Sequence, residues 1–230
     1  MTLLLQNVAP ADADTLAAAE TEMTTVLDVL WLGGWVMIPL LLLSLLTIYL
    51  FVERLITLRT AQADPDHITD RIRQYVRSGD IQGALSYCSS EDAPITRILR
   101  HGLERLGRPI SEIQDAVQAA GKHEAFELEK RTEWLASIAG VAPMLGFLGT
   151  VLGMIRAFQD IQALEGNVNP SVLAGGIWEA LLTTAAGLAV GIIALVFYNY
   201  LLNRIRRITN DLERSATDFI DLLQEPVSSE

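Results

Sequence analysis

The sequence predicts an all-α membrane protein with three transmembrane helices and long helical extensions outside the membrane. Three apolar blocks support this prediction, because each is long enough for the roughly 20 residues that cross a hydrocarbon core of about 30 Å. Half of the 230 residues are hydrophobic and the mean hydropathy is +0.31. Such values, concentrated in blocks, are typical of an integral membrane protein.

Lysine and arginine are distributed very unevenly along the chain. None of the 17 precedes Arg54, twelve lie between Glu53 and Glu133, four follow Leu202, and Arg156 stands apart. Loops rich in these residues remain on the cytoplasmic side of a membrane. We therefore expect the N-terminus and the polar hairpin on the opposite side, and the C-terminus in the cytoplasm.

This orientation divides the chain into consecutive segments. We predict an N-terminal segment on the far side, three spans, a cytoplasmic helical domain, a short hairpin and a cytoplasmic C-terminal helix with its tail. In chain order the boundaries are 1–30 (N-terminal segment), 31–53 (first span), 54–133 (cytoplasmic domain), 134–158 (second span), 159–171 (hairpin), 172–202 (third span) and 203–230 (C-terminal helix and tail).

The cytoplasmic domain has the apolar spacing of short helices. Asp66 and Asp80 are expected to cap the first two of them, and the first of these ends at Ser78 and Gly79. A third helix is expected from Pro94 to Gly107.

One long helix is predicted to follow. Pro109 breaks the preceding helix, and Ser111 with Gln114 resembles a capping box. No breaker except Gly121 follows before the membrane, so the helix should continue without interruption into the second span. A similar continuation is expected after the third span, with disorder after Gln224.

Composition excludes several classes of function. The net charge of −11 and the absence of a basic, aromatic-studded surface disfavour nucleic acid. The single cysteine, Cys88, cannot form an internal disulfide, and the three histidines lack the spacing of metal ligands. No nucleophile–base set or phosphate loop is evident. We therefore expect no enzymatic activity, no metal and no cofactor.

The second and third spans each divide into a small, polar face and a bulky face. In a membrane, stripes of small residues let helices approach closely, so the glycines are expected to serve helix packing. These glycines are Gly146, Gly149, Gly153, Gly187 and Gly191. Thr150 is the only hydroxyl in the middle of the second span, and Thr183 and Thr184 lie on or beside the polar face of the third.

Glu179 and Arg156 are the charged residues within these two spans. A carboxylate at this depth is costly and is functional by default. We therefore prefer a proton-path or pore-lining role for Glu179 over a structural hydrogen bond between subunits. For Arg156 we expect a simpler role, in which it reaches the outer headgroups or pairs with Asp160.

The chain resembles the ExbB/TolQ/MotA family of proton-channel subunits over nearly its whole length. The resemblance is densest in VAPMLGFLGTVLGMIRAF (141–158) and IWEALLTTAAGLAVGIIALVFYN (177–199). The GGWVMIP and FVERL motifs (33–39 and 51–55) are more similar to ExbB than to TolQ. MotA-type subunits have four spans, so the span count argues against that branch.

The resemblance implies a homopentamer in the inner membrane, enclosing single-span ExbD-like subunits that contribute an aspartate. Proton flow would then move a TonB-like protein and energise outer-membrane transport. By motif, Thr150 and Thr184 match the hydroxyls that face the aspartate, and Glu179 matches a glutamate of the proton path or of a subunit contact. Thr183 places a second hydroxyl next to that of Thr184. The resemblance therefore leaves open which of the two threonines faces the aspartate.

Two alternatives remain at this point. A TolQ-like subunit would energise the Tol-Pal envelope system through a TolR-like partner. A structural membrane scaffold would use the glycine stripes only for oligomerisation.

Overall fold

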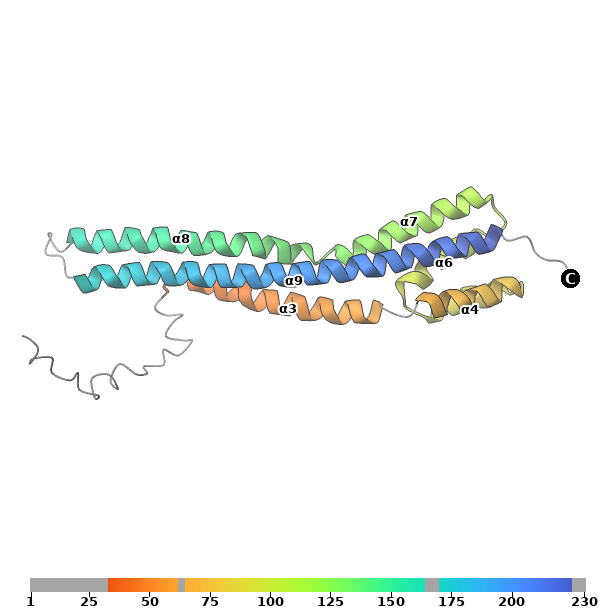
Figure 1. Cartoon of the computed structure of the whole chain (residues 1–230), viewed down its shortest axis with the longest axis horizontal. Coiled ribbons are helices and arrows are strands. Elements are labelled where there is room, and N and C mark those ends of the chain that lie inside the picture. Colours follow the sequence, from red (N-terminus) through yellow and green to blue (C-terminus); the bar gives the residue numbers. More distant parts are fainter. Residues whose placement is uncertain (1–32, 62–64, 164–169, 225–230) are drawn as a thin grey trace, which may run out of the picture. The chain divides into compact units, whose positions relative to one another are not determined.

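The computed structural model describes residues 33–61, 65–163 and 170–224, and each regular element in these ranges is a helix (Figure 1). The predicted N-terminal segment, residues 164–169 of the hairpin and the tail after Gln224 lie outside the described residues. The helices are α3 (Met37–Ala61), α4 (Pro65–Arg77), α5 (Ile81–Ser90), α6 (Pro94–Leu103), α7 (Ile110–Glu129), α8 (Glu133–Ala163) and α9 (Pro170–Gln224).

The chain forms two compact units. Among the described residues, the first unit contains 33–41, 145–163 and 170–186, and the second contains 42–61, 65–144 and 187–224. Helices α3, α8 and α9 contribute to both units. The first unit holds the predicted site, and the second holds the helices α4–α7.

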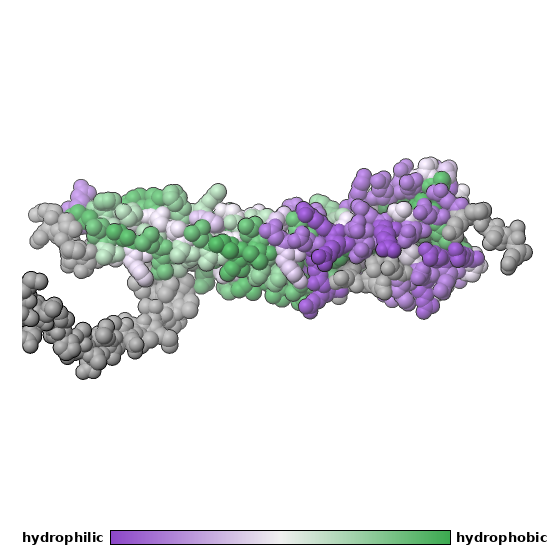
Figure 2. Space-filling model, viewed as in Figure 1, coloured by the Kyte–Doolittle hydropathy of each residue, from purple (hydrophilic) through white to green (hydrophobic). Residues whose placement is uncertain are grey.

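Three stretches are long and apolar enough to cross a membrane, namely Met37–Arg59, the stretch that ends in α8 at Ala163, and Leu173–Gln224. This confirms the predicted all-α fold with three membrane helices. Large apolar side chains on these helices are exposed, among them Leu42, Phe147, Leu181 and Ile192. On the face drawn in Figure 2, hydrophobic side chains gather over α3, α8 and α9, and hydrophilic ones over the shorter helices. Exposed apolar surface of this extent indicates contact with lipid or with other subunits.

The core of the second unit lies where α6 packs against α7 and the C-terminal part of α9. Ile98, Leu99 and Phe219 are completely buried there. A Cβ atom on Gly102 would lie 2.7 Å from the Phe219 ring and 2.8 Å from a Val117 methyl group. A glycine is therefore required for this close approach.

Several predicted boundaries of the short helices are confirmed. The Asp80 carboxylate accepts a hydrogen bond of 2.9 Å from the Gly83 amide, so it caps α5 as expected. Gly79 and Gly107 have φ angles of 76° and 91°, in the left-handed region that glycine tolerates. Gly79 follows the end of α4, as predicted, whereas α6 ends at Leu103, four residues before the predicted end at Gly107.

Two predicted caps are wrong, because each helix begins before the predicted capping residue. Helix α4 begins at Pro65, so Asp66 lies inside its first turn and does not cap it. Helix α7 begins at Ile110 after Pro109, with no side-chain cap, so Ser111 lies within the helix and forms no capping box. Pro65 is the first residue of α4, where the fixed φ of proline favours a helix start. Pro109 is the residue that precedes the first turn of α7.

The predicted continuous helix into the second span is interrupted between α7 and α8. Residues 130–132 form a turn, in which the Thr132 amide bonds to the Glu129 carbonyl at 2.8 Å. The turn contains neither glycine nor proline. The Arg131 guanidinium reaches Glu53 of α3 at 2.8 Å. After the third span, α9 continues to Gln224 without a break, as predicted.

A partly buried ion pair joins α6 to α7 in the second unit. Two nitrogens of Arg97 donate to the two carboxylate oxygens of Glu124 at 2.8 and 2.7 Å. The hydrogen bonds that Arg97 donates to Glu124 raise the pKa of Arg97 above its usual value. On α5, burial raises the pKa of the Cys88 thiol to about 11.

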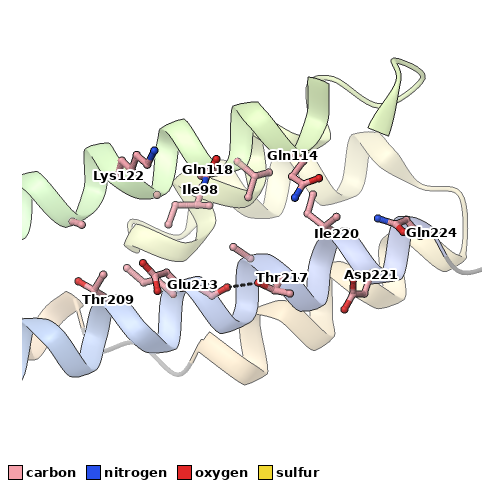
Figure 3. A pocket seen from close by; sticks show the side chains of 15 residues that line it. Ile98, Gln114, Gln118, Lys122, Thr209, Glu213, Thr217, Ile220, Asp221 and Gln224 are labelled. Carbon is pink, nitrogen blue, oxygen red and sulfur yellow. Dashed lines mark hydrogen bonds between the residues drawn. The ribbon is translucent and has the colours of Figure 1, made fainter. Parts of the chain in front are cut away.

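A groove of about 520 Å³ opens between α7 and α9, with α6 at its base (Figure 3). Gln114, Gln118 and Lys122 line one side, and Glu213 and Asp221 line the other. The groove belongs entirely to the second unit.

Candidate functional site

In the first unit, α8 and α9 pack through their small residues. A Cβ atom on Gly149 would lie 2.6 Å from the Cβ of Thr183, and one on Gly153 would lie 3.0 Å from the Cβ of Ala180. Closer to the hairpin, a Cβ on Gly176 would lie 2.6 Å from the Cβ of Ala157. The two helices therefore approach along a stripe of glycine and alanine, in an antiparallel register.

The predicted packing glycines lie on these faces. Gly146, Gly149 and Gly153 are buried on α8, and Gly187 and Gly191 are buried on α9. In the second unit, a Cβ on Gly191 would lie 2.7 Å from the Pro143 ring. The small faces that the sequence analysis identified thus pack against each other within one chain.

The three predicted hydroxyls differ in their surroundings. Thr183 is buried and donates to the Ala180 carbonyl of its own helix at 2.8 Å. Thr184 donates across to the Gly146 carbonyl of α8 at 3.0 Å, so it joins the two helices. Thr150 is half-buried and donates to the Phe147 carbonyl at 2.6 Å. Each hydroxyl oxygen retains lone pairs that can accept a further hydrogen bond.

Glu179 forms an ion pair with Arg156. The Arg156 Nη1 atom donates to the Glu179 Oε1 atom at 2.8 Å. The Glu179 side chain is 25% exposed and that of Arg156 is 45% exposed. The expected pairing of Arg156 with Asp160 is wrong, because the guanidinium extends across to α9 and does not fold back along α8.

The antiparallel hairpin explains this partner. Arg156 lies seven residues before the end of α8 at Ala163, and Glu179 lies nine residues after the start of α9 at Pro170. Opposite charges at similar depths on two joined helices face each other. Counting positions from the hairpin is the signal that could have identified the pair from the sequence.

Gly34 is a third member of this cluster, and the sequence analysis missed its role. It has a φ angle of 66°. A Cβ atom there would overlap the Glu179 carboxylate, and would lie 3.2 Å from the Arg156 Nη1 atom. The backbone that leads into α3 therefore contacts the charged pair directly.

The chemical capacity of this site is limited. It offers hydroxyls that can order water and a carboxylate already bound to a guanidinium, within apolar helices. A proton path through lipid requires a chain of protonatable groups or ordered water. These residues alone cannot form a complete path of this kind.

The fold and this site define a multi-pass helical membrane protein with polar groups set into its apolar helices. Residues 90–214, more than half of the chain, match the MotA/TolQ/ExbB proton channel family. The chain belongs to that family, as the resemblance indicated.

Individual relatives agree with this assignment. The ExbB-like 3 protein of Synechocystis sp. is 32% identical over 73% of this chain and 80% of its own length. The biopolymer transport protein ExbB of Neisseria meningitidis is 30% identical over 80% of this chain and 88% of its own length. The Tol-Pal system protein TolQ of Haemophilus influenzae is 35% identical over 47% of each chain.

Proposed function

We propose that this chain is an inner-membrane motor subunit that uses the proton motive force to energise TonB-dependent transport across the outer membrane. In this proposal several copies surround single-span ExbD-like subunits, which pass the resulting motion to a TonB-like protein. Thr150, Glu179, Thr183 and Thr184 form the chain's own share of the proton route.

The observation that supports this proposal most strongly is the incompleteness of the site. Its hydroxyls lie along α8 and α9, and Glu179, the only carboxylate between residues 172 and 202, is bound to Arg156. A relay built from these groups lacks a free acid. A partner with a membrane-embedded carboxylate supplies it, which accounts for the requirement for ExbD-like subunits.

We further propose a homopentamer with its N-terminus in the periplasm and its C-terminus in the cytoplasm. The asymmetry of Lys and Arg supports this orientation. In this proposed orientation, the helices α4–α7 and the C-terminal part of α9 lie in the cytoplasm. The exposed apolar faces of α3, α8 and α9 then contact lipid and neighbouring subunits.

A TolQ-like role in the Tol-Pal system is the second candidate, because a TolQ protein is among the relatives. The ExbB relative matches 80% of this chain, whereas the TolQ relative matches 47%. The greater coverage favours the ExbB role.

Complementation distinguishes the two roles. The chain and its single-span partner are expressed in a strain lacking its own ExbB and TolQ. We expect uptake of an iron chelate to return, and detergent resistance to remain low. Restored detergent resistance without chelate uptake would assign the chain to the Tol system. If neither chelate uptake nor detergent resistance is restored, the result would contradict a motor function.

Site variants extend this experiment. Thr150→Val and Thr184→Val should lower chelate uptake at least tenfold at equal protein levels. Thr217→Val is the matched control, because this exposed threonine also bonds to a carbonyl of its own helix, Glu213, at 2.9 Å. Uptake that is unchanged in both site variants would exclude the proposed route.

A further inference from the structure

The charged pair of the first unit joins three segments of the chain. Arg156 comes from α8, Glu179 from α9, and Gly34 from the backbone that precedes α3. A proton-path glutamate would need neither an arginine partner nor a glycine with a positive φ angle beside it. The cluster therefore requires an explanation of its own.

The geometry fixes the carboxylate on two sides. The Arg156 Nη1 atom binds Oε1 at 2.8 Å, and the Gly34 backbone lies so close to the same oxygen that any side chain at residue 34 would displace it. A charge-assisted hydrogen bond is roughly twice as strong as a neutral one. Protonating Glu179 would weaken this bond, and moving the carboxylate would require the Gly34 turn to move.

Charge pairing also offsets the cost of placing these groups in the membrane. An isolated charge at membrane depth is energetically costly. Removing one member of a buried ion pair leaves the other charge without an opposite charge beside it. Exchanging the two residues keeps one positive and one negative charge in contact. An experiment can therefore distinguish a requirement for the ion pair between residues 156 and 179 from a requirement for a carboxylate at residue 179.

We propose that Arg156 and Gly34 are positioning residues that hold Glu179 as a fixed charge at the hairpin end of the three spans, so that Glu179 orders the proton route without carrying protons itself. This inference rests on the proposed function. The moving proton is then carried by the acid of the partner subunit and by water at the hydroxyls of Thr150 and Thr184.

Charge reversal tests the inference. The full chain is reconstituted with its single-span partner in proteoliposomes, and proton uptake is measured under an imposed membrane potential. Arg156→Glu and Glu179→Arg should each lower the flux at least tenfold, because each places two like charges together. The double variant Arg156→Glu/Glu179→Arg should recover flux to within about threefold of the wild type. Arg156→Lys, which retains the cation, should keep most of the flux.

Asp160→Asn is the matched control. It removes an exposed carboxylate four residues from Arg156 on the same helix, and should leave the flux unchanged. The size of each complex in detergent is measured in parallel, because a single reversal can prevent assembly. We expect the double variant to assemble like the wild type.

Two outcomes would overturn the inference. In one, the double variant assembles and remains as inactive as the single variants, which would show that an acid is required at residue 179. In the other, the double variant fails to assemble, which would show that the two charges are not interchangeable. Absence of flux from the wild-type complex would instead contradict the proposed function, so the two failures are distinguishable.

Discussion

At the scale of single residues, the site depends on positions where no side chain fits. Gly34 lies against the Glu179 carboxylate, and Gly149 lies against Thr183. Both glycines permit a contact between segments that are distant in sequence. Substitutions there test the geometry directly, because the chain also offers glycines without such neighbours.

Gly34→Ala should lower both the thermal stability and the proton flux of the complex. The left-handed φ angle of residue 34 costs an alanine about 1–2 kcal/mol, and the new methyl group also displaces the carboxylate. Gly79→Ala is the control, since Gly79 has a φ angle of 76° but no atom within 4 Å. Equal losses in both variants, measured by thermal unfolding in detergent, would show that the contact with Glu179 is unimportant.

Gly149→Ala should destabilise the packing of α8 against α9 by about 1–3 kcal/mol, the usual cost of overfilling a packed interface. The new methyl group would overlap the buried Thr183 side chain. Gly140→Ala on the same helix meets nothing within 4 Å and should show no loss. The measurement is the unfolding temperature of each variant relative to the wild type. A loss at Gly140 as large as that at Gly149 would contradict the packing described here.

At the scale of elements, the sequence predicts helices and their buried faces well, and their junctions less well. The small and bulky faces of α8 and α9 follow from the period of 3.6 residues, and the Asp80 cap follows from a local side-chain bond. The break at residues 130–132 does not follow from such local patterns. It accompanies a contact between Arg131 and Glu53, which are 78 residues apart in the sequence. Pairs of this kind leave no local signal.

The same reason limits prediction of the site. Glu179 and the threonines were recognisable as polar groups in apolar helices. The partner of Glu179 is found only by counting positions on two helices from the hairpin, and the role of Gly34 depends on a backbone angle. Neither is encoded in the spacing of residues along one helix.

The contact between α6 and α7 should depend unequally on its two charged residues. Glu124 is 10% exposed, so Arg97→Ala leaves a buried carboxylate without a partner, whereas Arg97 is 45% exposed and can turn to water in Glu124→Gln. We expect Arg97→Ala to cost about 1–3 kcal/mol, at the lower end because of solvent screening, and Glu124→Gln to cost less. Arg100→Ala, which breaks an exposed pair with Glu104, should cost under about 0.5 kcal/mol. If thermal unfolding shows that Glu124→Gln lowers the stability as much as Arg97→Ala does, the proposed unequal dependence on the two residues is wrong.

Cys88 reports on the folding of α5. Its pKa of about 11 keeps the thiol protonated, so a maleimide should label the native protein slowly at pH 8 and rapidly after denaturation. The unfolded chain loses this proton at lower pH than the folded chain. Stability should therefore decline as the pH rises from about 9 toward 11. Cys88 is the only cysteine, so the signal belongs to one site. Rapid labelling of the native protein would contradict its burial.

At the scale of the whole molecule, the chain presents more apolar surface than one copy can cover. The large hydrophobic side chains of α3, α8 and α9 are exposed, and the polar groups of the site are few. In the proposed assembly, lipid and other subunits cover these apolar faces. The central claim is that protons cross this assembly only when a partner completes the route.

Proton flux into proteoliposomes tests this claim most directly. Three preparations are compared under the same imposed potential: the chain with its single-span partner, the chain alone, and the chain with a partner whose membrane acid is replaced by asparagine. The account predicts flux in the first preparation only. Equal flux from the chain alone, or no flux from an assembled complex with the intact partner, would contradict it.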